Sequence, residues 1–294
     1  YLLDLRNGIK KKFKSYYIPY VKWSIVFILA HYILYQLNFY SNSYSFTETI
    51  LNILLAITMM KTEMLLGGYW FLSSLLWASI TSLIYIYLLN KYKKLNNITL
   101  VGGVILSIIF ATFEAILLDC FPQIKIPSQF DPHTVMAFSF FISGYILRRA
   151  NFLRIKSVMP LWILFIFPAF FAIFVDWSMN MSKEWSIIYF CIALCGTLGL
   201  LDLSRQISNT KVAVLFKYVG NKTLYILTFH FLCFKIVAWC YLYYTDGSLM
   251  RLTEFPHMKT DEWWMWIVYL FAGVALPLGI WELFHRIPIL KKIL

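Results

Sequence analysis

Apolar stretches of 15 to 21 residues recur along almost the whole chain, and they restrict its fold more than any other feature. A helix that crosses a bilayer needs about 20 mostly apolar residues. We therefore expect an all-α polytopic membrane helix bundle with about eight spans, placed in a cell membrane. The expected spans are Val21–Phe39, Trp70–Leu89, Ile98–Leu118, His133–Leu147, Val158–Val175, Ser186–Leu203, Thr223–Tyr243 and Trp264–Phe284.

Composition agrees with a chain that lies mostly in lipid. The sequence is 61% hydrophobic and 14% charged, whereas soluble domains are about 45–50% apolar and about 25% charged. The 26 basic residues outnumber the 14 acidic ones, but no compact soluble segment exists to present a basic face to nucleic acid. Residues 1–294 are expected to form a single integral-membrane domain with the lipid bilayer as a partner.

The cysteines do not indicate a metal site. The five of them (Cys120, Cys191, Cys195, Cys233 and Cys240) fall mostly inside apolar runs, without a CxxC pair or a histidine at ligand spacing. Small buried apolar side chains explain them best. No metal is expected.

The basic residues orient the expected spans. With both termini in the cytoplasm, 20 of the 26 basic residues lie on the cytoplasmic side, five lie outside and Lys235 lies within a span. Such a bias is typical of cytoplasmic loops. The segment 45–61 is apolar, amphipathic and shorter than a span, so it is expected to form a re-entrant or interfacial helix outside the first span.

Labelling of single cysteines tests this orientation. Residues introduced at Lys94 and Arg149 should resist an impermeant maleimide added from outside, whereas one at Lys259 should react, because the first two lie in the basic cytoplasmic loops. Labelling of positions 94 and 149 from outside would refute the topology.

Two ionisable residues lie inside the segment "NKTLYILTFHFLCFKIVAW" (221–239), where a charge costs about 2.5–3.5 kcal/mol on insertion scales. His230 lies about 10 Å deep at 1.5 Å per residue. It is either a neutral imidazole bonded between helices or part of a polar cavity. Lys235, near the bilayer middle, forms an ion pair, extends its ammonium to an interface, or lines the same cavity.

Three other ionisable residues lie near the expected spans. Glu114 is either the partner of Lys235 or a general base near the outer end of its helix. His31 is isolated in its span and reads as a packed histidine. His133 follows Asp131-Pro132 at an expected helix start and belongs to the outer interface.

A lysine cluster precedes the first expected span. Lys11, Lys12 and Lys14 lie in "IKKKFKSYYIPY" (9–20). They either anchor the chain through the positive-inside bias and anionic lipid headgroups, at about 1 kcal/mol each, or bind the phosphates of a nucleotide-bearing donor.

Several segments together resemble the acyltransferase-3 family, integral-membrane O-acyltransferases of bacterial envelopes. Each motif is loose alone, but five occur in the family's order over nearly the whole chain. They are "KKFKSYYIPY" (11–20), "GGYWFLSSLLWA" (67–78), "AFSFFISGYILRR" (137–149), "YVGNKTLYILTFHFLCFKIV" (218–237) and "EFPH" (254–257).

The resemblance implies about ten spans, so two are expected before Tyr1. The family's catalytic histidine lies on its first span, about eleven residues after a basic residue, and no such pair occurs here. The chain is therefore expected to be an N-terminally truncated domain whose main catalytic histidine is absent. The resemblance assigns donor-phosphate contacts to the lysine cluster and to Arg148 and Arg149 at the inner mouth. Trp70 and Phe71 are motif positions, and His230 is the family's late histidine.

The implied activity is transfer of an acyl group, most often acetyl, from cytoplasmic acyl-CoA to a hydroxyl of an envelope or extracellular polysaccharide or a glycan lipid. His230 and Glu114 are then the catalytic candidates in this chain, and Lys235 is a polar residue of the channel. Acetyl-CoA is a donor substrate, and no resident cofactor is expected. The alternatives are a transporter or exporter of a glycan or small anion, which also carries polar residues in its spans, and a structural membrane partner without activity.

Overall fold

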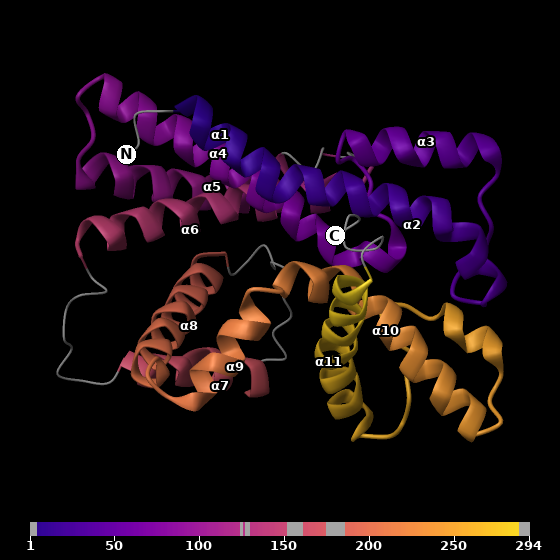
Figure 1. The fold of residues 1–294 in the computed structure, drawn as a ribbon. Coiled ribbons are helices and arrows are strands. Elements are labelled where there is room, and N and C mark those ends of the chain that lie inside the picture. The colour runs from indigo at the N-terminus through magenta and orange to yellow at the C-terminus, as the bar shows by residue number, and fades with distance from the viewer. Residues whose placement is uncertain (1–4, 124–125, 127–129, 152–160, 175–185, 288–294) are drawn as a thin grey trace. The chain divides into compact units, whose positions relative to one another are not determined.

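The computed structural model describes residues 5–123, 126, 130–151, 161–174 and 186–287, and within them every regular element is a helix (Figure 1). This confirms the all-helical prediction. The elements are α1 (Leu5–Lys12), η1 (Phe13–Tyr17), α2 (Ile18–Gln36), α3 (Phe46–Ile57), η2 (Met64–Tyr69), α4 (Trp70–Lys91), α5 (Asn97–Cys120), α6 (Pro132–Arg149), η5 (Leu161–Phe165), α7 (Ile166–Phe174), α8 (Ser186–Ile207), α9 (Lys211–Gly220), α10 (Thr223–Tyr244), η7 (Leu249–Thr253) and α11 (Met265–Arg286).

Polar residues fix where several helices begin. Ser45 opens α3 with a capping box in which Glu48 bonds back to the Ser45 backbone, and Asn96 opens α5 in the same way with Thr99. Asp131 accepts from the backbone N–H of His133 at the start of α6. Such caps satisfy the first free N–H groups of a helix, so they set the register of the apolar runs that follow.

Six helices of the described residues are long and apolar enough to cross a membrane, which confirms a polytopic membrane protein. They are Leu5–Gln36, Met64–Lys91, Asn97–Cys120, Ile187–Ile207, Thr223–Tyr244 and Met265–Arg286. The predicted count of about eight is not supported by this part of the chain.

The difference comes from two predicted spans. Helix α6 has 18 residues, which rise about 27 Å and fall short of a hydrocarbon core of about 30 Å. Its ends are also polar, since His133 stands at one end and Arg148 and Arg149 at the other. The predicted span at 158–175 lies partly outside the described residues, and its described part forms η5 and α7.

The segment expected to be interfacial contains the 12-residue helix α3. Its polar Asn52 is buried and accepts a hydrogen bond from Lys61 Nζ at 2.9 Å, whereas Leu51 and Leu54 are exposed. Apolar residues that face outward while an amide faces inward suit a lipid environment. The helix is confirmed, and its place in the membrane interface stays a prediction.

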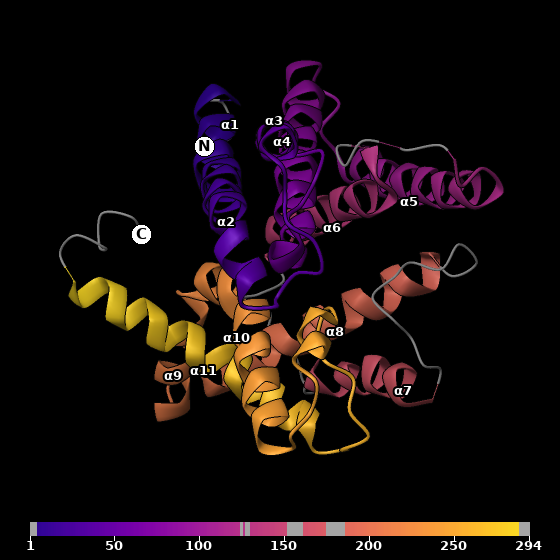
Figure 2. The same cartoon turned by 90° about the vertical axis from the view of Figure 1, so that its right-hand side faces the viewer.

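The described chain divides into two compact units. The first comprises residues 1–17 and 73–214, and in it α5 and α6 run side by side (Figure 1) around a core that includes Leu100, Met136 and Ile142. The second comprises residues 18–72 and 215–294, and in it α10 packs on α11 (Figure 2). The prediction of a single domain stays a prediction.

Candidate functional site

A cavity of about 350 Å³ lies in the first unit. Its volume falls at the lower end of the range of small-molecule sites, about 300–1,000 Å³. Most of the wall is apolar or aromatic, and two cations and two serines complete it. The lining residues are Lys12, Ser79, Ser82, Leu83, Ile86, Phe140, Phe141, Gly144, Tyr145 and Arg148.

The two cations come from helix ends. Lys12 is the last residue of α1, before the single π-turn η1, and its Nζ lies 5.6 Å from the ring centroids of both Tyr16 and Phe141. Arg148 belongs to the last turn of α6. Basic residues are favoured at helix C-termini, where the helix dipole is negative. The cavity therefore combines an apolar wall with two positive charges.

The cavity includes only part of the predicted donor-phosphate set. Lys12 and Arg148 line it, whereas Lys11 and Lys14 are exposed and do not belong to its lining. Arg149 is also exposed and donates from Nη1 to the carbonyl of Leu95 at 3.4 Å. The structure thus brings together one lysine of the cluster and one arginine of the pair.

Sequence reasoning missed most of the cavity wall. Ser79 and Ser82 use their hydroxyl hydrogens within α4, donating to the carbonyls of Leu76 and Ala78, so they offer acceptor lone pairs to a ligand. Gly144 also lines the cavity, and a Cβ added there would meet no atom within 4 Å. The only sequence signal for this wall was the aromatic-glycine stretch 137–149.

His230 has a defined tautomer in the second unit. Its Nδ1 lies 3.1 Å from the carbonyl oxygen of Ile226 and 3.0 Å from that of Leu227. Carbonyl oxygens only accept, so Nδ1 carries a hydrogen, and in the neutral ring Nε2 keeps the basic lone pair. The ring is half-buried, and its centroid lies 3.9 Å from that of the Phe231 ring. In its neutral form, His230 thus presents Nε2 as a proton acceptor.

The backbone of η2 lies close to this histidine. A Cβ on Gly68 would come within 2.8 Å of Leu227 and 3.5 Å of the His230 ring, so only glycine fits without a shift. Next to it, Tyr69 and Thr228 share a buried hydrogen bond of 2.6 Å. These contacts fix the α10 surface on which His230 lies.

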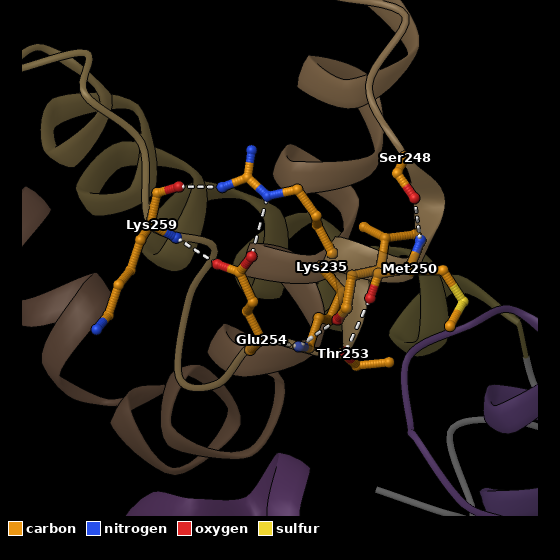
Figure 3. Close-up of polar contacts among 8 residues, drawn as sticks. Lys235, Ser248, Met250, Thr253, Glu254 and Lys259 are labelled. Atoms are coloured by element: carbon orange, nitrogen blue, oxygen red, sulfur yellow. Dashed lines mark hydrogen bonds and ion pairs between the residues drawn. The ribbon is translucent and has the colours of Figure 1, made fainter.

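Lys235 is almost fully buried, with 1% of its surface exposed. Its Nζ donates to the carbonyl oxygen of Leu252 at 2.6 Å and also to that of Glu254 (Figure 3). Both carbonyls belong to η7 and the residue after it. Main-chain oxygens therefore stabilise the buried amine, which was expected to form an ion pair, to extend to an interface or to line a polar cavity.

The segment that holds Lys235 is itself cross-linked by polar contacts (Figure 3). Arg251 donates to the Glu254 carboxylate at 3.0 Å, and the Lys259 backbone N–H donates to the same carboxylate at 2.9 Å. The Lys259 N–H bond and then the positive charge of Arg251 lower the pKa of Glu254. The carboxylate thus stays charged at neutral pH and links Arg251 to the backbone of Lys259.

Glu114, on α5, is 6% exposed, and its Oε2 has no hydrogen-bond partner among the described residues. It belongs to the first unit and Lys235 to the second, so their pairing stays a prediction, as does a catalytic role for Glu114. Trp70 and Phe71 open α4 with 41% and 46% of their surface exposed. Neither lines the cavity described above.

A family profile described as an acyltransferase domain matches residues 1–282, almost the entire chain. The chain belongs to the acyltransferase-3 family. It is therefore a multi-pass membrane acyltransferase, which confirms the resemblance drawn from the five motifs. No curated protein and no solved structure matches the chain significantly.

No group of three or more metal-ligating side chains occurs within the described ranges of this acyltransferase-3 chain. Among the residues of the candidate site, those available for chemistry are the two cations of the cavity, the His230 imidazole, the Glu114 carboxyl and the Lys235 amine.

Proposed function

We propose that this protein transfers an acyl group, most often acetyl, from cytoplasmic acyl-CoA to a hydroxyl of a cell-envelope polysaccharide or glycan lipid. The observation that carries the proposal is the cavity in which Lys12 and Arg148 flank an apolar and aromatic wall. Phosphate groups pair with lysine and arginine, and an acyl-pantetheine arm is uncharged and largely apolar. The cavity offers both surfaces.

The cavity is smaller than a complete CoA molecule, so it accommodates part of the donor. We assign it the diphosphate and the adjoining part of the pantetheine arm, with Arg148 forming a bidentate contact and Lys12 supplying a point charge. From the basic bias of the sequence we infer that both residues lie at the cytoplasmic side. This agrees with a donor drawn from the cytoplasm of a bacterium.

In the proposed reaction His230 Nε2 accepts the proton of the acceptor hydroxyl as the oxygen attacks the thioester carbonyl. The carbon–sulfur bond breaks, an ester forms and the CoA thiolate leaves. The thiolate then takes the proton from the imidazolium, which restores neutral His230. A neutral histidine with its Nδ1–H fixed by helix carbonyls suits this role. Family membership favours acyl transfer over export of a glycan or anion.

Charge removal at the cavity tests donor binding. Lys12→Gln and Arg148→Gln should each weaken acetyl-CoA binding about tenfold or more, since hydrogen bonds to charged groups contribute about 1.5–3 kcal/mol and 1.4 kcal/mol is tenfold. Calorimetry of the full chain in nanodiscs measures this. Lys14→Gln is the control, because Lys14 is exposed and outside the lining. An equal loss in all three variants would mean non-specific charge attraction.

A space-filling substitution tests the same cavity without changing charge. Gly144→Leu should block donor binding, because its side chain grows from the cavity wall where a Cβ meets open space. Gly102→Leu is the matched control on α5, since a Cβ there also meets nothing within 4 Å and Gly102 does not line the cavity. Normal acetyl-CoA affinity in Gly144→Leu would place the donor elsewhere.

A further inference from the structure

A buried histidine–carboxylate pair lies in the second unit, away from His230 in the sequence. His31 on α2 and Glu63, which caps η2, expose 2% and 5% of their surface. His31 Nδ1 lies 3.6 Å from Glu63 Oε1, and neither atom has another hydrogen-bond partner among the described residues. His31, which was expected to be an isolated packed histidine, therefore faces a carboxylate.

The second ring nitrogen fixes where a hydrogen must be. His31 Nε2 lies 2.9 Å from the carbonyl oxygen of Asn42, which can only accept, so Nε2 carries a hydrogen. In a neutral ring Nδ1 would then present a bare lone pair to the Glu63 carboxylate. Two buried acceptors facing each other leave both unsatisfied, which is unfavourable. One additional proton between them turns this contact into an ion pair.

The surroundings favour a positive ring. His31 stacks on Tyr44 with ring centroids 3.5 Å apart and planes 10° from parallel, and the Tyr40 ring lies 4.1 Å away. Tyrosine faces attract cations. Burial and then the negative charge of Glu63 raise the pKa of Tyr40, and burial with the charges of Glu63 and Glu48 raises the pKa of Tyr44 to about 12. Neither tyrosine therefore gives up its proton near neutral pH. The Tyr40 hydroxyl can share its hydrogen only with the Glu63 carboxylate, which leaves His31 Nδ1 without a donor.

The remaining charged groups on the packed elements are already engaged. Glu48 on α3 bonds to Ser45 in the capping box. Lys61 donates to Asn52 and lies 6.0 Å from the Tyr44 ring. The other oxygen of Glu63 accepts from the Leu65 backbone at 2.8 Å, so only Oε1 is directed to His31.

We propose that His31 and Glu63 form a proton-binding site that clamps the segment between α2 and η2. Uptake of one proton by the deprotonated pair gives an imidazolium–carboxylate pair, with no redox change and no other reactant. The proton is bound in the closed state and released when the segment opens. The closed state is therefore favoured at lower pH and lost as the pH rises, because it binds more protons than the open state.

A water molecule is the competing explanation. A cavity of about 10 Å³ borders Glu63 and is also lined by Tyr44 and Asn52. This is about the smallest volume that holds one water. A water that donated to both Nδ1 and Oε1 would satisfy them without an extra proton, so closure would then not depend on pH.

Glu63→Gln separates the two explanations. The amide that this substitution introduces can donate to a neutral His31 Nδ1, while its oxygen still accepts from the Leu65 N–H, so the clamp no longer needs the proton. Hydrogen exchange of residues 37–63 is measured in the full wild-type chain and in the variant at each pH, so the intrinsic pH dependence of exchange cancels. As the pH increases, the exchange rate of the wild type should rise relative to that of Glu63→Gln by up to about tenfold per pH unit. This is the dependence expected when opening releases one proton.

A direct measurement accompanies the exchange experiment. The ¹⁵N signals of the His31 ring, assigned by their loss in His31→Gln, should be those of an imidazolium in the closed state. If Glu63→Gln fails to fold, His31→Gln takes its place as the pH-independent reference in the exchange experiment. Parallel exchange at all pH values, or a neutral His31 ring, would overturn the proposal in favour of the water.

Discussion

His230→Asn is expected to abolish acyl transfer while the protein remains folded. The Asn amide nitrogen occupies the position of the imidazole Nδ1 and can still donate to the carbonyl of Ile226, so the structural contact of His230 is kept. The variant lacks Nε2 and with it the proton acceptor. General acid–base catalysis contributes about 10²–10⁴-fold, so the turnover rate should fall by at least about 100-fold.

His230→Gln supplies the matched comparison. Its amide reaches toward the Nε2 position but cannot accept a proton at neutral pH, so this variant should be inactive too and also lose the Nδ1 contact. Transfer from labelled acetyl-CoA to envelope glycan, measured beside acetyl-CoA affinity, separates the two effects. Affinity should be unchanged in His230→Asn. Near-normal turnover in that variant would show that the proton goes to another group.

Lys235→Met should destabilise the protein strongly. The substitution removes the donor to the carbonyls of Leu252 and Glu254, and each buried group left unsatisfied costs about 1–3 kcal/mol. A total of about 2–4 kcal/mol is expected, since Glu254 is only half-buried. Had Lys235 paired with a buried carboxylate, the loss would have been larger, about 3–5 kcal/mol, because removing one member of a buried ion pair leaves an uncompensated charge.

Thermal unfolding in detergent, followed by tryptophan fluorescence, measures this loss. Lys259→Met is the matched control, because the Lys259 contacts in this loop come from its backbone, and its midpoint should be nearly unchanged. Lys235→Gln retains two amide hydrogens and should be intermediate. If Lys235→Met unfolds at the wild-type temperature, the two carbonyl contacts contribute little to the stability of the protein.

The long helices were predictable because an apolar run of about 20 residues in a bilayer satisfies its backbone hydrogen bonds by forming a helix. The helix at 46–57 was predictable as well, since its amphipathic pattern is local. The number of spans was less accessible, because α6 combines an apolar centre with polar ends at His133 and Arg149, and the sequence alone does not say how much of such a segment enters the hydrocarbon.

The partners of the buried polar residues were not predictable. The cost of burying Lys235 indicated that it must have partners, but main-chain carbonyls leave no signature in a sequence. His31 looked isolated because Glu63 is 32 positions away in an apolar surrounding. Likewise, Lys12 and Arg148 lie 136 positions apart in the sequence, and only the packing of α1, α4 and α6 shows that they share a cavity.

The contacts of Lys235 have a consequence for how this protein can diverge. Every residue type supplies a main-chain carbonyl, so most side chains at Leu252 and Glu254 can change without removing the acceptors. An insertion or deletion between Ser248 and Glu254 would instead shift both oxygens away from the amine. Relatives are therefore expected to vary in the sequence of this loop while keeping its length, and a lysine at this position should accompany that constant length.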